Sequence, residues 1–386
     1  MMHPEAPIRP VPTASFLAKR RWATVIAPNF KFRLSGVTSS IVQIVPQQCK
    51  LGQNVATLGP GLPDCLPRLR LRDLFSLWRL PFDGAPRVWH ARRNIEMLAG
   101  LVLRDVLRMP LKVLFTSAAQ RRHTAYTRWL LRRMDAVVAT SAASGAYLDV
   151  SHTVVPHGID IARFSPGREA GRDHPATTWF IGCFGRVRPQ KGTDLFVRSM
   201  IALLPNFPGW TAVVCGRVTS RHTAFADGLK QAVDAAGLSD RILFLGEVDD
   251  IRPWFSRLTL YVAPARSEGF GLTPLEAMAS ATAVVASDAG SHAQAVVTGR
   301  TGTLVPADDG EALTRAIRPY LAAPEMALEC GRNGLFRVQA HFTLEQEARQ
   351  LGVVYEAVRF GAESLSQMPI EAASPGLIGQ SLQAAE

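Results

Sequence analysis

Short, continuously apolar runs alternate with helix-like segments through most of this 386-residue chain. The runs do not alternate polar with apolar residues, which is the pattern of strands that are covered on both faces. Parallel sheets with helices on both sides contain such strands, so the sequence predicts an α/β fold. The runs of the first half span 22–28, 54–61, 87–93, 111–118, 135–141 and 152–158. Those of the second half span 178–186, 211–218, 241–248, 258–265, 281–290 and 302–307.

A polar stretch rich in Pro and Gly, SPGREAGRDHPAT, separates the two series of runs and is typical of a linker. The sequence therefore predicts two doubly wound, Rossmann-like domains, with ligands in an interdomain cleft outside the carboxyl ends of the strands. In chain order we expect a loose N-terminal segment (1–21), an N-terminal domain (22–164), the linker (165–177), a C-terminal domain (178–342), a helix packing back across the cleft (343–360) and a disordered tail (361–386).

The charge is distributed unevenly along the chain. Residues 1–170 contain 24 Lys and Arg against 10 Asp and Glu, whereas the remaining residues contain 19 against 22. A basic first half is expected to face something anionic, either nucleic acid, a membrane surface or an acidic substrate, unless it reflects only a general preference for arginine. The five cysteines are widely spaced without a C-x-x-C motif, so neither disulfides nor a zinc site is predicted. No membrane-spanning run or signal peptide is recognised, and we expect a cytoplasmic protein.

The stretch SEGFGLTPLEAMAS (267–280) follows a predicted strand and places Glu268 and Glu276 eight positions apart. Glu268 is expected at the carboxyl end of that strand, where ligands of α/β folds bind. The turn between the two acids contains two glycines, which let a backbone approach a ligand closely. Free N–H groups near Gly271 and Leu272, just before a helix, are suited to a diphosphate.

Two interpretations of Glu276 remain open. The sequence T-P-L-E, with Thr273 as the helix cap, matches a capping box in which the glutamate bonds back to the cap residue. Alternatively, its carboxylate accepts hydrogen bonds from the two hydroxyls of a nucleotide ribose.

A second motif, FGRVRPQKG (184–192), also lies between a predicted strand and a predicted helix. Its Arg186 and Lys191 are expected at the same edge of the sheet, where cations would neutralise a departing diphosphate. No Asp-x-Asp occurs, since the pairs at 249–250 and 308–309 are adjacent, so the site is predicted to work without a metal.

With both motifs in this context, the chain resembles the retaining glycosyltransferases of the GT-B type, family 4. The resemblance covers roughly residues 22–360. It rests on the E-x7-E spacing with G-F-G-L inside it, and on G-R-x-x-x-x-K-G (185–192), VVPHGID (154–160) and AVVASDAG…VVTGRTGTLV (283–305). More narrowly, the chain is similar to the lipopolysaccharide core mannosyltransferases of alpha-proteobacteria, in APNFKFRLSGVTSSIVQ, ATLGPGLP, VWHARRNIEM, FTSAAQRRHTAYT and FGRVRPQKGTDLFVR.

This resemblance implies a retaining transfer of mannose from GDP-mannose, without a metal or other cofactor. The implied acceptor is the Kdo-containing inner core of lipopolysaccharide on lipid A, which carries carboxylates and phosphates. Such an enzyme would associate peripherally with the inner face of the inner membrane, whose lipids are anionic, and would bind no nucleic acid. The basic first half of the chain agrees with these partners.

The same resemblance assigns the acceptor to the N-terminal domain (22–164) and the nucleotide sugar to the C-terminal domain (178–342). Roles for individual residues also follow from it. Glu268, Arg186 and Lys191 would serve the transfer, with the two cations on the diphosphate. The donor would be bound by Gly36 in the loop after the first strand, by the backbone near Val248 for the base, by Glu276 for the ribose, and by the turn of Gly269, Phe270, Gly271 and Leu272. The candidates on the acceptor side are Arg92, Arg93, Arg121, Arg122, His90 and His123.

The chain departs from the family pattern in three places. Many members carry a histidine after the strand equivalent to 112–117, where this chain has Ser117 and Ala118, so His90 and His123 are considered as replacements. The usual G-G-x-x-E ends here in Gln294, and His157 stands where asparagine is common.

Three other functions are considered. A related transferase could use another nucleotide sugar, for glucosyl or galactosyl transfer in exopolysaccharide assembly. A non-catalytic anion-binding protein or scaffold on this fold is disfavoured, because the basic residues form no recognisable RNA-binding motif. A nucleotide-sugar epimerase on this architecture would release sugar without needing an acceptor.

Overall fold

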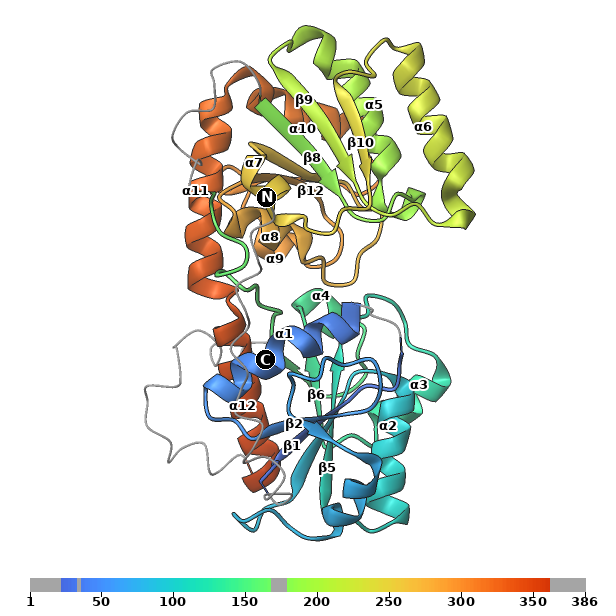
Figure 1. Cartoon of the computed structure of the whole chain (residues 1–386), viewed down its shortest axis with the longest axis vertical. Coiled ribbons are helices and arrows are strands. Elements are labelled where there is room, and N and C mark those ends of the chain that lie inside the picture. The colour runs from blue at the N-terminus through green and yellow to red at the C-terminus, as the bar shows by residue number, and fades with distance from the viewer. Residues whose placement is uncertain (1–21, 33–35, 168–178, 362–386) are drawn as a thin grey trace, which may run out of the picture. The chain divides into compact units, whose positions relative to one another are not determined.

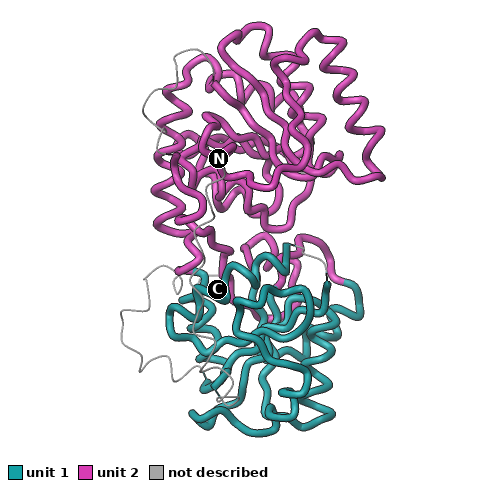
Figure 2. The backbone as a smooth tube through the Cα atoms, viewed as in Figure 1, with its two compact units in different colours: residues 1–116, 124–138, 347–386 teal, residues 117–123, 139–346 magenta. Residues whose placement is uncertain are grey.

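The computed structural model describes residues 22–32, 36–167 and 179–361. The chain forms two compact units (Figure 2): the first consists of Met1–Thr116, Thr124–Val138 and Glu347–Glu386, and the second of Ser117–His123 and Ala139–Gln346. The predicted N-terminal segment, nearly all of the predicted linker and nearly all of the predicted tail lie outside the described residues.

The described residues form two sheets, as the apolar runs predicted. One has seven strands in the order β3-β2-β1-β4-β5-β6-β7, and the other has six in the order β10-β9-β8-β11-β12-β13. Every neighbouring pair of the six-stranded sheet is parallel, as are β1–β2, β1–β4, β2–β3 and β4–β5 of the other. The strands are β1 (Val25–Pro28), β2 (Val55–Leu58), β3 (Arg68–Leu69), β4 (Arg87–Ala91), β5 (Leu111–Ser117), β6 (Ala136–Ala139), β7 (Thr153–Val154), β8 (Trp179–Phe184), β9 (Trp210–Cys215), β10 (Ile242–Gly246), β11 (Leu260–Ala263), β12 (Ala283–Ser287) and β13 (Gly302–Val305).

Helices connect these strands (Figure 1). The first half has α1 (Gly36–Lys50), the 3-10 helix η2 (Leu71–Trp78), α2 (Asn94–Leu101), the π-helical segment η3 (Val102–Val106), α3 (Ala125–Leu131) and α4 (Ala142–Gly145). The second half has the 3-10 segments η4 (Pro189–Lys191), η5 (Leu204–Asn206) and η6 (Ser220–His222), and the helices α5 (Thr193–Leu203), α6 (Thr223–Ala235), α7 (Arg252–Arg257), α8 (Thr273–Ala279), α9 (His292–Ala295), α10 (Gly310–Ala322), α11 (Pro324–His341) and α12 (Leu344–Phe360).

In each sheet the chain starts near the middle, moves outward on one side, and then returns to the other side. In the six-stranded sheet it runs from β8 through β9 to β10 and then to β11 on the opposite flank of β8. The sheet of the first half repeats this order around β1 and β4. Loops that follow the two strands at such a switch point diverge and leave room for a ligand. The loops after β8 and β11 contain the two motifs singled out from the sequence.

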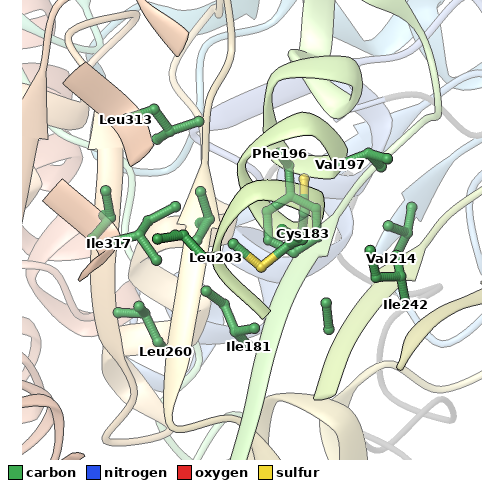
Figure 3. Close-up of a cluster of buried hydrophobic side chains, with 14 of the residues drawn as sticks. Ile181, Cys183, Phe196, Val197, Leu203, Val214, Ile242, Leu260, Leu313 and Ile317 are labelled. Carbon is green, nitrogen blue, oxygen red and sulfur yellow. The ribbon is translucent and has the colours of Figure 1, made fainter. Parts of the chain in front are cut away.

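The six-stranded sheet is covered on both faces, which explains its continuously apolar strands. Along β9, Ala212 and Val214 belong to one buried cluster, whereas Val213 and Cys215 belong to another on the opposite face. The first cluster includes side chains of α5 and α10 (Figure 3). The second includes side chains of α7 and α8. Cys183 and Cys215, in β8 and β9, are buried free thiols.

Some elements differ from the sequence predictions. The helical pattern over 94–108 is α2 followed by a π-helical segment, and the pattern over 120–134 is helical only from Ala125. Thr124 caps α3 by accepting a hydrogen bond from the N–H of Thr127. The short strand β3 and the helix η2 were not predicted, because two residues carry no periodicity and η2 is a 3-10 helix with three residues per turn.

Most of α12 belongs to the first unit and is joined to it by buried polar contacts. The Tyr355 hydroxyl accepts a hydrogen bond from Nε2 of Gln48 in α1 at 3.0 Å and lies 2.8 Å from Nδ1 of His90 in β4. Gln53 donates to the backbone carbonyl of Ala348 at 2.7 Å. These contacts join the last helix to residues about 300 positions earlier in the chain.

We expect Tyr355→Phe to destabilise the first unit by about 1–3 kcal/mol, because the substitution leaves buried polar atoms of Gln48 and His90 without a partner. Thermal and urea unfolding followed by circular dichroism measure the change. Tyr126→Phe is the matched control, since Tyr126 is 48% exposed. Equal unfolding midpoints for the two variants would contradict the structural role of the Tyr355 hydroxyl.

Candidate active site

An ion pair joins the two motifs at the switch point of the six-stranded sheet. Lys191 ends η4, which follows β8, and Glu268 follows β11. The Lys191 ammonium donates a short hydrogen bond to Oε2 of Glu268, and the Gly269 N–H donates to Oε1 at 3.0 Å. Both side chains are largely buried. The sequence prediction that Lys191 and Glu268 lie at one edge of the sheet is therefore confirmed.

This pairing keeps Glu268 ionised. Burial by itself would raise the pKa of its carboxyl group, but the Lys191 ammonium and the Gly269 N–H outweigh burial and hold that pKa below its ordinary value. The site thus contains a carboxylate that is held in place beside the Lys191 ammonium.

The turn that follows Glu268 is tightly packed. Phe270 is buried, and the ring of His157 meets it edge to face with the ring centroids 5.0 Å apart. Gly271 has a φ of 83°, and a β-carbon there would lie 2.6 Å from Nε2 of His292. Among the described residues, the N–H groups of Gly271 and Leu272 have no hydrogen-bond acceptor. The predicted free donors are therefore present in this turn.

Glu276 does not cap its helix. Helix α8 begins at Thr273 with Leu272 in the cap position, and no side chain caps it. The predicted Thr273 cap is wrong by one residue, and the capping-box interpretation of Glu276 is not realised. Burial raises the pKa of the Glu276 carboxyl to about 7, partly offset by the positive charges of Arg163 and Lys191. A partly buried carboxyl with a raised pKa and no hydrogen-bond partner among the described residues is a candidate ligand-binding group.

His292 was missed by the sequence reasoning, although it stands in the departing Gly-Ser-His-Ala-Gln segment. It is fully buried, and its Nδ1 lies 2.9 Å from the carbonyl oxygen of Ser287, which fixes Nδ1 as the protonated nitrogen. Burial lowers its pKa, so the ring is neutral and its Nε2 faces the turn at Gly271 as an acceptor. This position beside the turn could not be predicted from the sequence, because it arises only when the fold brings the turn and α9 together.

A second missed residue, Arg266, supports the Lys191 loop. Its guanidinium forms two 2.8 Å hydrogen bonds with the carboxylate of Asp194 and one of 2.6 Å with Asp308. Its backbone N–H donates to the carbonyl oxygen of Gln190 at 2.9 Å. These bonds tie the end of β11 to η4 and to the first turn of α5, and so hold the two motifs in register.

The remaining donor-side candidates lie at strand ends but are not joined to this pair by a hydrogen bond among the described residues. Arg186 is exposed in the loop after β8. Val248 is partly buried just after β10, next to Cys215. Gly36 is the first residue of α1, so it begins a helix instead of lying in a loop as predicted. The binding roles of these residues stay predictions.

His90 is a structural residue in the described chain. Its ring is completely buried, with Nδ1 2.8 Å from the Tyr355 hydroxyl and Nε2 2.7 Å from the Thr116 hydroxyl. Because both ring nitrogens are engaged, His90 cannot take the place of the missing family histidine without giving up a buried hydrogen bond.

Arg93 and Arg92 are also engaged with their own unit. One guanidinium nitrogen of Arg93 donates to Glu96 at 2.6 Å and to Asn29 at 2.8 Å, and the other donates to Thr38 at 3.0 Å. Arg92 is partly buried, and its N–H donates to Glu96 at 2.8 Å. Arg93 is thus part of an ion-pair network within its own unit, and the acceptor-side roles of Arg92 and Arg93 stay predictions.

The loop after β5 contains the other acceptor-side candidates. Arg121 and Arg122 are exposed. His123 is half-buried, its pKa is lowered by burial and by the charge of Arg121, and its Nε2 has no hydrogen-bond partner among the described residues. These three residues therefore remain available for a ligand, and of the two candidate histidines only His123 has a ring nitrogen without a partner.

Neither a metal nor a membrane span is indicated by the described part of the chain. It holds no group of three or more His, Cys, Asp or Glu side chains arranged to bind a metal ion. No helix in it is long and apolar enough to cross a bilayer.

Two curated proteins are similar to this chain over almost their whole length. The first is the lipopolysaccharide core biosynthesis mannosyltransferase LpcC of Rhizobium leguminosarum bv. viciae, with 65% identity over 339 residues, 86% of this chain and 96% of that protein. The second is the lipopolysaccharide core biosynthesis mannosyltransferase LpsB of Rhizobium meliloti (strain 1021), with 54% identity over 343 residues, 86% of this chain and 97% of that protein. Residues 179–323 match the family described as glycosyl transferases group 1.

The chain belongs to the group 1 glycosyltransferases. Sucrose-phosphate synthase from Thermosynechococcus elongatus matches its structure with a TM-score of 0.71, over 90% of this chain and 100% of that chain, at 22% identity. That likeness shows the fold, which is GT-B with two doubly wound Rossmann-like units. The protein is an enzyme, and its two rhizobial relatives make it a mannosyltransferase.

For this glycosyltransferase we expect Glu276→Gln to raise stability above pH 7. The Glu276 carboxyl has a pKa of about 7 in the folded chain against an ordinary value of 4.5, so the folded state holds its proton longer than the unfolded state. The free energy of unfolding of the wild type therefore falls as the pH rises between these two pKa values. The variant does not lose this stability, because its amide has no proton to release. Thermal unfolding at pH 8 should favour the variant by about 1–3 kcal/mol.

The same variant should bind nucleoside diphosphate about tenfold more weakly, as calorimetry would show, because an amide is a weaker acceptor than a carboxylate for ribose hydroxyls. Glu329→Gln is the control, since Glu329 lies on the exposed side of α11. If Glu276→Gln were less stable at every pH and its nucleotide affinity were unchanged, the result would support the capping-box interpretation of Glu276 instead.

Proposed function

We propose that this enzyme transfers mannose from GDP-mannose onto the Kdo-containing inner core of lipopolysaccharide, with retention of anomeric configuration and without a metal. The observation that carries the proposal is the near full-length similarity to two proteins named as lipopolysaccharide core biosynthesis mannosyltransferases. The GDP base, the Kdo acceptor and membership of family 4 come from the motif resemblance.

The geometry of the second unit supports a diphosphate leaving group. Lys191 is fixed at the switch point, where its charge can neutralise the phosphate oxygens as the sugar departs. The N–H groups of Gly271 and Leu272 lie in the adjoining turn, ready to donate to the same oxygens. In this proposal Glu268 holds Lys191 and the transferred sugar, Glu276 binds the ribose, and Arg186 adds a second positive charge.

We further propose a chemistry in which the acceptor hydroxyl attacks on the face from which the diphosphate leaves. The departing phosphate oxygen takes the proton of that hydroxyl, the new glycosidic bond forms, and the bond from the anomeric carbon to the phosphate oxygen breaks. The products are the mannosylated acceptor and GDP. No protein nucleophile is required, which fits a site whose carboxylate is already paired with Lys191.

The acceptor of this proposal is an anionic glycolipid, so the enzyme would work in the cytoplasm at the inner face of the inner membrane. The excess of basic residues in the first half supports this placement, because Kdo carboxylates, lipid A phosphates and inner-leaflet lipids are all anionic. Arg121, Arg122 and His123 are the acceptor-side residues that the first half leaves available.

The experiment that tests the function is transfer of radiolabelled sugar from a panel of GDP- and UDP-sugars onto Kdo-bearing lipid A precursor, with EDTA present. We expect transfer from GDP-mannose alone, at an undiminished rate in EDTA. Transfer from a UDP-sugar instead would replace the donor assignment, and loss of transfer in EDTA would contradict metal independence. Sugar released equally fast without acceptor would contradict a transferase role.

Lys191→Ala should lower kcat about 10²-fold, because it removes a charge that stabilises the leaving diphosphate and leaves the Glu268 carboxylate buried without its partner. Arg186→Ala should act in the same direction while leaving stability unchanged, since Arg186 is exposed. Steady-state kinetics with varied GDP-mannose gives both values. Lys230→Ala, an exposed lysine of α6, is the control. If Lys191→Ala kept the wild-type turnover, the ion pair would not be part of the active site.

A further inference from the structure

Three helical segments of the first unit expose apolar side chains at helical spacing. In η2 the exposed residues are Leu71, Phe75 and Trp78, which are three and four positions apart. Along α2 and η3 they are Ile95, Leu98, Val102 and Val106. In α3 they are Tyr126 and Trp129. A helix of a soluble protein normally buries such a stripe in the core. Three exposed stripes in one unit therefore indicate a surface that binds another surface when the protein functions.

Hydrogen bonds join these segments into one surface. The Trp78 indole N–H donates to the carbonyl oxygen of Leu107, just after η3, at 2.7 Å. Arg104 of η3 donates to the carbonyl oxygen of Arg133, just after α3, at 3.1 Å. Asn94 at the start of α2 donates to the Thr127 hydroxyl of α3 at 2.8 Å. Helices α2 and α3 accordingly lie side by side (Figure 1). We call the surface formed by these exposed stripes the apolar face.

The aromatic side chains of the apolar face are held in place. Phe75 and Trp78 stack with their ring centroids 6.0 Å apart, and Tyr126 and Trp129 stack at 6.2 Å. The Arg133 guanidinium lies over the Trp129 ring, 4.0 Å from its centroid. Phe75 is 73% exposed in spite of this order. Rigid, exposed aromatic rings lose little conformational entropy when another surface covers them.

The charge around the apolar face is predominantly positive. Residues 68–135 carry 15 Lys and Arg against 5 Asp and Glu, a net charge of +10 in a chain whose total is +11. Asp105 and Asp135 are paired with Arg104, and Asp73 is buried at the start of η2, where it accepts from the N–H of Arg70. The exposed acids Asp83, Asp105 and Asp135 are each paired with an arginine, either Arg359 or Arg104. The border of the apolar stripes therefore keeps an excess of exposed arginines, among them Arg72 and Arg132.

We propose that the apolar face docks on an anionic lipid bilayer, with its aromatic side chains in the interfacial layer and its arginines on lipid phosphates. Aromatic rings and arginine side chains are the groups that suit a bilayer interface, because each has an apolar body and a polar tip. A border with a net positive charge complements anionic headgroups and needs no shape-matched protein partner. The inference deepens the membrane contact proposed above and names the face that makes it, but depends on neither the donor nor the acceptor.

The test is sedimentation of the full chain with vesicles of phosphatidylcholine alone or with about one third phosphatidylglycerol. The wild type should bind the anionic vesicles and bind them less as salt is raised. Phe75→Ser combined with Trp129→Ser should weaken binding at least tenfold, because both rings lose apolar contact with the interface. Phe336→Ser is the matched control, since Phe336 of α11 is 67% exposed and lies in the second unit.

The charged border is tested separately. Arg72→Gln combined with Arg132→Gln should weaken binding to the anionic vesicles about 20-fold and flatten its salt dependence, at roughly fivefold for each arginine near the surface. Arg221→Gln, an exposed arginine of η6, should leave binding unchanged. Unchanged binding of the Phe75/Trp129 variant, or wild-type binding to neither vesicle, would overturn the proposal. If the wild type were a dimer, and the Phe75/Trp129 variant lost the dimer but still bound vesicles as the wild type does, the apolar face would bind a second copy of the chain instead.

Transfer assays keep this proposal distinct from the proposed function. The Phe75/Trp129 variant should retain wild-type transfer to acceptor dispersed in detergent and lose it on acceptor embedded in anionic vesicles. Vesicle binding by a wild type that transfers no mannose would leave the docking face standing and overturn the function. Equal loss of transfer in detergent and on vesicles would show that these two residues act on the reaction itself and would overturn the docking role.

Discussion

The ion pair between Lys191 and Glu268 is the interaction on which the arrangement of the second unit's site depends. Each residue follows one of the two strands at which the chain reverses direction in the sheet, so the topology alone brings their loops together. Gly192 makes the approach possible, because a β-carbon there would lie 1.8 Å from the carbonyl oxygen of Pro264. A largely buried ion pair adds little net stability once desolvation is counted. Its value here lies in holding two opposite charges at a fixed place.

The sheet of the first half has the same topology, and its switch point between β1 and β4 is built in another way. There Arg93 donates to Glu96, Asn29 and Thr38, and both oxygens of the Glu96 carboxylate accept hydrogen bonds. The network closes on itself and leaves no charged group of this set for a ligand. In the second unit, by contrast, neither the Glu276 carboxyl nor the Gly271 N–H has a hydrogen-bond partner among the described residues. The two sheets share one topology, but the polar groups at the first switch point pair with one another, whereas these two groups near the second are left to bind a ligand.

The sequence could predict the strands and the two motifs because both depend on neighbours in the chain. Continuous apolar runs, such as that over 211–218, report burial on both faces wherever they occur, and the motifs lie directly after such runs. His292, Arg266 and the partners of His90 could not be predicted in this way. Their roles arise from residues 5 to 265 positions away, including the contact of His90 with Tyr355. A basic residue after a strand end, such as Arg93, looks the same in sequence whether it faces a ligand or a buried carboxylate.

Helix α2 shows how the closed network of the first unit also determines what that unit exposes. Its buried side contains Glu96, held inward by Arg93, together with Met97, Gly100 and Leu101. Gly100 lets the helix lie against the Trp89 ring, whose Cδ1 would be 2.7 Å from a β-carbon there. Since a charged residue occupies the inner side, Ile95 and Leu98 must point outward. Apolar residues occur on both sides of this helix, so periodicity alone cannot say which side is buried. The ion pair decides it, and the exposed stripe that results is part of the apolar face.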